Sequence, residues 1–145
     1  MTPSQLDILE LTMRELRRDP APAASFFYAS LFTKRPGLQP VFGAAFDHDG
    51  RRLLGILNVV VAGLTDPQRF LGLLTLFARP EVREHLDDQR CVLAIGHALQ
   101  RMLEHHLAEF YTEDVRDAWK AAYQHVWDVV ENGLVRGAEP ASSLH

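Results

Sequence analysis

The apolar residues of this chain recur at intervals of three and four positions, which is the spacing of one face of an α-helix. No convincing stretch alternates strictly between apolar and polar residues, as a half-buried strand would. Ser4 and Asp7 open the first helical series in the manner of a capping box, and the prolines at 20 and 22 end it. The apolar members of that series are Leu6, Leu9, Met13 and Leu16. The pattern predicts an all-α protein.

Prolines, glycines and capping residues divide the rest of the pattern into further helices. The proline at 22 suits the first turn of a second helix, and the segment Arg35-Pro36-Gly37 ends that helix. Asp66 and Pro67 begin a later helix, and Thr112, followed by two acidic residues, begins the last one. About seven helices are therefore expected, over residues 4–19, 22–34, 38–42, 46–64, 66–77, 92–110 and 112–133.

A single bundle of these helices accounts for almost the whole chain. Its 145 residues are a usual size for one domain, and they contain no internal repeat and no long linker. Residues 1–137 are expected to form the domain, with the last helix fraying near Gly133 and residues 138–145 forming a flexible C-terminal tail. Helices that cross at steep angles leave a cleft that a flat apolar cofactor can fill.

Charge and cysteine content argue against several classes of function. Fifteen Lys and Arg against nineteen Asp and Glu give a formal charge of −4, and no basic run offers a footprint for nucleic acid or an anionic membrane. The most apolar stretch, Leu53 to Leu64, is too short to span a bilayer, and the N-terminus does not resemble a signal peptide. The single cysteine, Cys91, cannot form an internal disulfide and is expected to be a small buried hydrophobe. These observations favour a cytoplasmic protein.

Four segments match one known family in their order and spacing. Phe27 to Phe42 is similar to a second helix and the corner that follows it, and Arg52-Leu53-Leu54 is similar to a distal helix. Val115 to Tyr123 is similar to the start of a last helix, which Ile95-Gly96 precedes at about the right distance. These segments resemble the globin family, especially bacterial single-domain globins and the haem domains of flavohaemoglobins. The resemblance implies a globin-like bundle that holds haem b (iron protoporphyrin IX), with a diatomic gas as its ligand.

The resemblance also implies which side chains line the haem pocket. Phe42 matches the phenylalanine that stacks on the haem, and Tyr28 matches the distal tyrosine, whose hydroxyl would donate a hydrogen bond to dioxygen. For both residues, and for the leucines at 53 and 57, an ordinary place in the core is the alternative. The full set of implied contacts is Tyr28, Phe42, Phe46, Asp49, Leu53, Leu57, Phe77, Val92 and Ile95.

The distal position that carries Gln or His in relatives falls on Asp49 in this chain. An ionised carboxylate at that position would repel the partial negative charge of bound dioxygen. Asp49 therefore either stands in the pocket despite this cost or points outward. If it points outward, His48 or no residue at all takes the distal role.

The proximal side departs further from the family pattern. The position of the iron-ligating histidine falls on Glu81 when counted from Leu53, and on Val82 when counted back from Gly96. His85 is the nearest histidine, and it would serve as the iron ligand if this helix gained a turn and the next loop lost about three residues, a mild change in free energy. The alternative is a solvated histidine within a charged run. A tyrosine that supports the proximal histidine in relatives is replaced by a valine at 92.

Two functions follow from these readings. The first is a haem protein that binds dioxygen or another diatomic gas through iron on His85, with nitric oxide chemistry requiring a separate reductase. The second is a globin-fold module without haem that acts as an interaction or sensor domain, which the residues at the expected histidine position favour. A homodimer through the two C-terminal helices is compatible with either function. The histidines at 97, 105 and 106 are expected on the surface and not in a zinc site, because their spacing does not bring them together.

Overall fold

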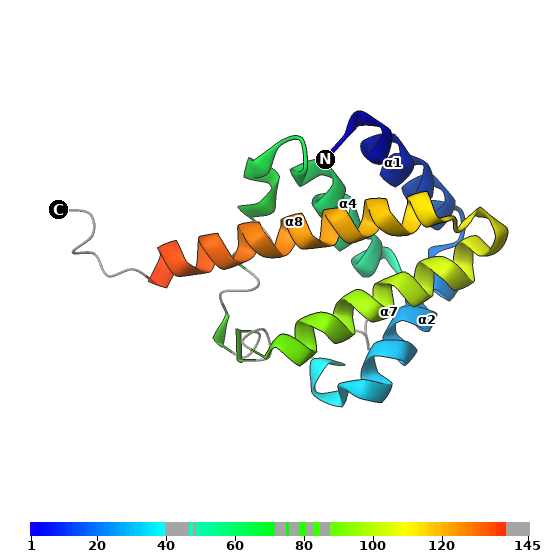
Figure 1. Ribbon diagram of the computed structural model, residues 1–145. Helices are drawn as coiled ribbons and strands as arrows, with labels where there is room; N and C mark the ends of the chain where they lie inside the picture. The colour runs from blue at the N-terminus through cyan, green and yellow to red at the C-terminus, as the bar shows by residue number, and fades with distance from the viewer. Residues whose placement is uncertain are drawn as a thin grey trace.

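A computed structural model describes residues 1–39, 47, 49–71, 75, 79–80, 83–84 and 88–138, with side chains described as far as 132. This part of the chain forms five α-helices and three 3-10 turns, and it contains no strand (Figure 1). The all-α prediction is confirmed. The predicted number of about seven helices is not matched among the described residues, and the two further segments at which helices were expected, 38–42 and 66–77, lie partly outside those residues.

Helix α1 spans Pro3–Arg18 and begins one turn earlier than its apolar series. Its N-cap is Thr2, whose hydroxyl accepts a hydrogen bond from the Gln5 amide at 3.1 Å. The Gln5 side chain accepts one from the Thr2 amide at 3.1 Å in return. The capping box predicted at Ser4 is therefore wrong. Proline has a backbone already suited to the first helical position, so the helix starts at Pro3 and the cap moves to the residue before it.

Helix α2 spans Pro20–Lys34 and is followed by the 3-10 turn η1, Pro36–Leu38. Helix α4 spans Arg51–Gly63, so it begins five residues later than the apolar pattern predicted. The reason is Gly50, whose φ of +76° is left-handed and cannot continue a helix. The residues between 64 and 71 contain the 3-10 turn η3, Pro67–Phe70, where the sequence predicted the first turn of a helix.

Two long helices complete the described fold. Helix α7 spans Gln89–Leu107, the 3-10 turn η4 spans Ala108–Phe110, and helix α8 spans Glu113–Ala138. The Thr112 hydroxyl accepts from the third amide of α8 at 3.3 Å, which confirms the predicted cap. Helix α8 continues past the predicted fraying point to residue 138. Phe110 was expected on the apolar face of α7 but is 66% exposed, because the chain turns at η4 before reaching it.

The helices cross one another around one core, as Figure 1 shows. Helix α8 runs across α1 and α4, and α7 packs on α2. The indole of Trp119 in α8 is 1% exposed and donates a hydrogen bond of 2.8 Å to the Thr12 hydroxyl in α1. This bond satisfies the one polar atom of the largest core side chain. The other largest fully buried side chains are Phe27, Phe70, Leu9, Met13, Leu16, Leu31, Leu38, Met102, Leu103 and Val130.

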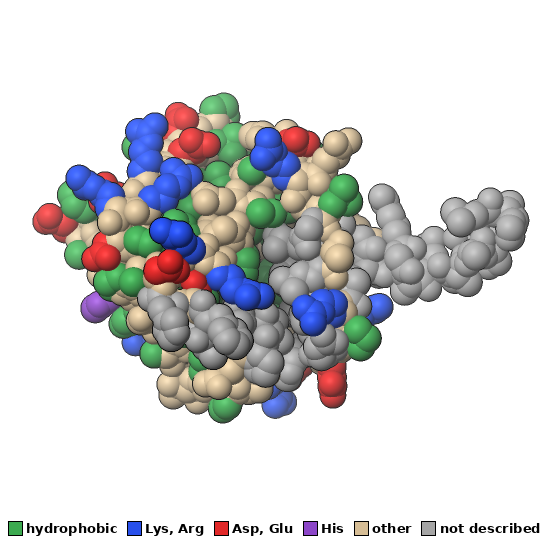
Figure 2. Space-filling view, turned by 180° about the vertical axis from the view of Figure 1, so that it is seen from behind, with side chains coloured by type: hydrophobic (Ala, Val, Ile, Leu, Met, Phe, Trp, Pro, Cys, Tyr) green, Lys and Arg blue, Asp and Glu red, His purple; other side chains and the backbone are tan. Residues whose placement is uncertain are grey.

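Two features of the surface bear on possible partners. Side chains of both charge signs occur on the face shown in Figure 2. This mixture agrees with the formal charge of −4 and differs from the one-sided basic surface that nucleic-acid binding requires. Among the described helices, none combines the length and the apolar character needed to cross a membrane.

Candidate functional site

Tyr28 lies on the buried side of α2, at the position predicted to face the distal side of the pocket. Its side chain is 8% exposed and stacks on Phe32, with ring centroids 5.5 Å apart and ring planes 8° apart. Phe27 meets it edge to face, with centroids 5.6 Å apart. Its hydroxyl donates a hydrogen bond to the carboxylate of Asp47. The tyrosine is therefore held by aromatic contacts along its ring and by one acidic partner at its tip.

Asp47 is a buried acidic residue, 5% exposed, placed just before α4. Its Oδ1 accepts from the Arg52 amide at 2.9 Å, and its Oδ2 accepts from the Leu53 amide at 3.1 Å as well as from the Tyr28 hydroxyl. The first amides of a helix have no acceptor within the helix, and the helix dipole makes that end positive. Asp47 supplies the missing acceptors with a negative charge, so α4 and Tyr28 are tied together through one side chain.

Asp49, the residue aligned with the distal position of relatives, lies at the surface. Its side chain is 61% exposed and pairs with the Arg51 guanidinium at 3.1 Å, and its carboxylate also accepts from the Arg51 amide at 3.2 Å. This is the outward-pointing alternative of the two that the sequence left open. His48, the other distal candidate, lies outside the described residues.

Asp47 was not among the site residues predicted from the sequence, because the predicted helix began at residue 46 and so included it. A signal was nevertheless present, because Asp47-His48-Asp49-Gly50 is a cluster of the residue types that favour turns and helix caps. A cap assigned to this cluster would have moved the start of α4 to residue 51 and pointed to a carboxylate beside it.

Leu53 and Leu57 on α4 are the apolar residues of the candidate site, and together with Tyr28 and Asp47 they form one wall of it. They are 4% and 6% exposed and lie one turn apart on α4, so their side chains share one face of the helix. The wall thus combines hydrocarbon, an aromatic ring and one satisfied acidic group, which suits one face of an apolar macrocycle. The predicted contacts Phe42, Phe46 and Phe77, the predicted iron ligand His85 and the aligned positions Glu81 and Val82 lie outside the described residues.

The remaining two predicted contacts lie on α7. Ile95 is half-buried against the core, and Val92 is half-buried and offers its carbonyl oxygen to the hydroxyl of Tyr123 from α8. The Tyr123 ring lies directly over Gly96, where an added Cβ would come within 2.8 Å of the ring. A tyrosine from α8 therefore packs against the part of α7 that contains the predicted contacts Val92 and Ile95.

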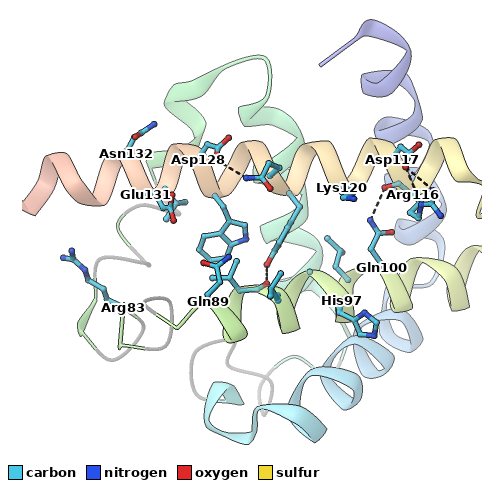
Figure 3. A pocket seen from close by; sticks show the side chains of 18 residues that line it. Arg83, Gln89, His97, Gln100, Arg116, Asp117, Lys120, Asp128, Glu131 and Asn132 are labelled. Carbon is cyan, nitrogen blue, oxygen red and sulfur yellow. Dashed lines mark hydrogen bonds and ion pairs between the residues drawn. The ribbon is translucent and has the colours of Figure 1, made fainter.

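A cleft of about 820 Å³ opens between α7 and α8 beside this tyrosine (Figure 3). Gln100 and Arg116 stand at one end of it, and Arg83 and Glu131 stand at the other. The Gln100 amide donates to the Arg116 carbonyl oxygen at 3.1 Å, which ties the two helices at the first end. Of the predicted haem contacts that the structure describes, Val92 alone lines this cleft.

The histidines of α7 show no metal-binding arrangement. The His105 ring stacks on Phe26 at 4.3 Å, and His106 contacts the Glu15 carbonyl oxygen at 3.3 Å, while His97 is exposed at the rim of the cleft. Within the described ranges, no group of three or more His, Cys, Asp or Glu side chains could hold a metal ion. Cys91 is 1% exposed, as predicted, and burial raises the pKa of its thiol.

Tyr28 and Tyr123 are expected to make the protein less stable at high pH. Burial raises the pKa of Tyr28, and its bond to Asp47 and the charge of Asp47 raise it further, while burial also raises the pKa of Tyr123. Both hydroxyls should stay protonated in the folded state above pH 10, where the unfolded chain releases their protons. The free energy of unfolding is expected to hold below about pH 9 and then to fall by at most about 1.4 kcal/mol per pH unit for each tyrosine.

Urea unfolding between pH 8 and 11.5 measures this slope, and Tyr28→Phe and Tyr123→Phe should each flatten it. Equal slopes in the wild type and in both variants would show that neither hydroxyl is responsible.

Comparison with known proteins places the candidate site within a known family. The globin family model matches residues 25–130, a range that contains Tyr28, Asp47, both wall leucines and the α7–α8 cleft up to Val130. No curated protein matches the chain.

Proposed function

The chain belongs to the globin family, and from this membership we propose that it is a haem protein that reversibly binds dioxygen or nitric oxide. Globins generally bind a diatomic gas through haem. We propose haem b as the cofactor, because it needs no covalent bond to the chain, whereas c-type haem is attached through a pair of cysteines and this chain has one cysteine. The observation that carries the proposal is the buried distal wall, in which Tyr28 stands beside Leu53 and Leu57 inside the matched range.

The proposal assigns a role to each residue of the predicted pocket. His85 holds the iron, Tyr28 and two leucines of α4 form the distal wall, and the haem supplies the iron on which the gas binds. The contacts that complete the pocket are Phe42, Phe46, Phe77, Val92 and Ile95.

The chain's own side chains supply binding and orientation. Hydrocarbon on both faces excludes water from the cofactor and lowers the local dielectric constant. The second ring nitrogen of His85 is expected to donate to a carbonyl or carboxylate, which would fix the orientation of the ring and make it a stronger ligand. Glu84 and Asp87 are the nearest acidic residues in the sequence.

The test is the visible spectrum of the protein after addition of hemin. We expect a Soret band that shifts on reduction and again on addition of carbon monoxide, and uptake at one haem per chain. His85→Ala should lose the spectrum of histidine-ligated haem and bind hemin at least about tenfold more weakly, since the loss of the axial bond leaves apolar contacts alone. The matched control is His97→Ala, because His97 is an exposed histidine of α7. This variant should bind hemin as tightly as the wild type does.

A featureless spectrum at full hemin addition would overturn the haem proposal. The second candidate function is then favoured, a globin-fold interaction or sensor module without haem, for which the presence of Glu81 at the aligned histidine position is the specific observation. A normal spectrum in His85→Ala would keep the haem but assign its iron to another ligand.

Two partners belong to the same proposal. Oxidation of nitric oxide to nitrate would require electrons from a separate reductase, so we propose gas binding without turnover for the chain by itself. A homodimer through α7 and α8 stays a prediction, for which the elution volume of the purified protein is the measurement.

A further inference from the structure

The Tyr28 hydroxyl and the Asp47 carboxylate form a buried pair that joins α2 to the start of α4. Both side chains are less than 10% exposed. A tyrosine hydroxyl has one proton to donate, and here it is donated to Oδ2 of Asp47. The direction of this bond matters because a distal tyrosine can stabilise a gas ligand only by giving that same proton to it.

Asp47 has no spare donor with which to reverse the bond. It receives hydrogen bonds from the Arg52 amide, the Leu53 amide and the Tyr28 hydroxyl, the pattern of a carboxylate that only accepts. The two amides hold it at the positive end of α4, where a negative charge is favoured. Rotation of Asp47 away from Tyr28 would break these contacts as well, so the pair is fixed by the helix and not by the tyrosine alone.

We infer that Asp47 is a positioning residue that keeps the Tyr28 hydroxyl proton away from the gas ligand, so that dioxygen in the distal pocket receives no hydrogen bond from this tyrosine. This inference rests on the proposed haem function. Because bound dioxygen would receive no hydrogen bond from Tyr28, it is expected to dissociate rapidly. Tyr28 stands at the position predicted to stabilise the ligand, but its hydroxyl proton is already donated to Asp47.

Asp47→Ala removes the acceptor of the Tyr28 hydroxyl, so that its proton can turn to the pocket. Asp47→Asn would not do this cleanly, because its one remaining oxygen can take the place of Oδ2 and still accept from Tyr28 and the Leu53 amide. Asp47→Ala also removes the acceptors of the Arg52 and Leu53 amides, so a loss of stability is expected and an unfolding measurement accompanies the kinetic one.

The experiment measures the dioxygen dissociation rate constant of the haem-loaded, reduced full chain. In the wild type, Tyr28→Phe should change this rate by less than about twofold, since no hydrogen bond to the ligand is lost. Asp47→Ala should slow dissociation by about tenfold, which is the effect of one added hydrogen bond. In the Asp47→Ala background, Tyr28→Phe should abolish that slowing. Asp49→Asn, which removes an exposed carboxylate two residues away, should leave the rate unchanged.

A second readout does not depend on gas binding. Urea unfolding of the wild type, the two single variants and the double variant gives the coupling between Tyr28 and Asp47, expected to be about tenfold in the unfolding equilibrium constant. A tenfold faster dissociation in Tyr28→Phe alone, an unchanged rate in Asp47→Ala, or a coupling below twofold would each overturn the inference. Failure to take up hemin at all would overturn the proposed function instead, and it is recognised by the missing Soret band.

Discussion

Gly50→Ala is expected to lower the free energy of unfolding by about 2–5 kcal/mol, a large part of the stability of a domain this size. The backbone of Gly50 has a φ of +76°, which costs any residue with a Cβ. An added Cβ would also lie 2.5 Å from the carbonyl oxygen of Pro20 and 3.1 Å from the Ala24 side chain. The close atom belongs to the backbone of α2, so relief requires that α2 and α4 move apart.

Gly55→Ala is the matched control, because Gly55 lies in the same helix and nothing stands within 4 Å of its added Cβ. Alanine favours a helix interior over glycine, so this variant should gain about 0.5–1 kcal/mol. Urea unfolding of both variants gives the comparison, in which the two substitutions have opposite signs. A Gly50→Ala protein as stable as the wild type would show that α4 does not begin where the structure places it.

Trp119→Ala is expected to lower the free energy of unfolding by about 3–5 kcal/mol. The side chain is 1% exposed and is the largest in the core, so its removal leaves a cavity that α1 and α8 cannot close. The same substitution removes the bond from its indole to Thr12. The measurement is again urea unfolding, with the midpoint and slope fitted together.

Thr12→Val divides this effect into its two parts. Valine keeps the volume of threonine but leaves the buried Trp119 indole without its acceptor, so a loss of about 1–3 kcal/mol is expected from the hydrogen bond alone. Leu11→Ala is the control on the same helix, since Leu11 is 57% exposed and its truncation should change stability by less than about 0.5 kcal/mol. Equal losses in Thr12→Val and Leu11→Ala would rule out the α1–α8 hydrogen bond as a source of stability.

The existence of the helices followed from local sequence, as did the Thr112 cap of α8, whereas the starts of α1 and α4 did not. The apolar spacing of α1, α2, α7 and α8 is visible in the chain, because burying one face repeats every three or four residues. The start of α4 was missed by five residues because the apolar residues before Gly50 resemble a further turn. The helix begins after Gly50 because the φ of that residue is +76°, and the carbonyl oxygen of Pro20, 30 positions away along the chain, leaves no room for a Cβ there.

Some residues of the candidate site were likewise predicted from the sequence, whereas others were identified only by the structure. Tyr28, Leu53 and Leu57 were named from the sequence by resemblance and periodicity, and the structure shows all three buried. Asp47 was not named, because a carboxylate before a helix has no evident partner in the linear chain. Asp49 was named from an alignment position, and the structure places it in solvent beside Arg51. Alignment locates a position along the chain but does not tell which way its side chain points.

By itself, the amino-acid sequence determined the all-α class, most of the helices and the family resemblance, since all of these depend on residue type and spacing. Only the tertiary structure decided that α4 begins at Arg51, that Asp47 caps it and that the Tyr28 proton is given to Asp47. These features depend on contacts between α2 and α4, and the direction of a hydrogen bond is set by which groups meet in space.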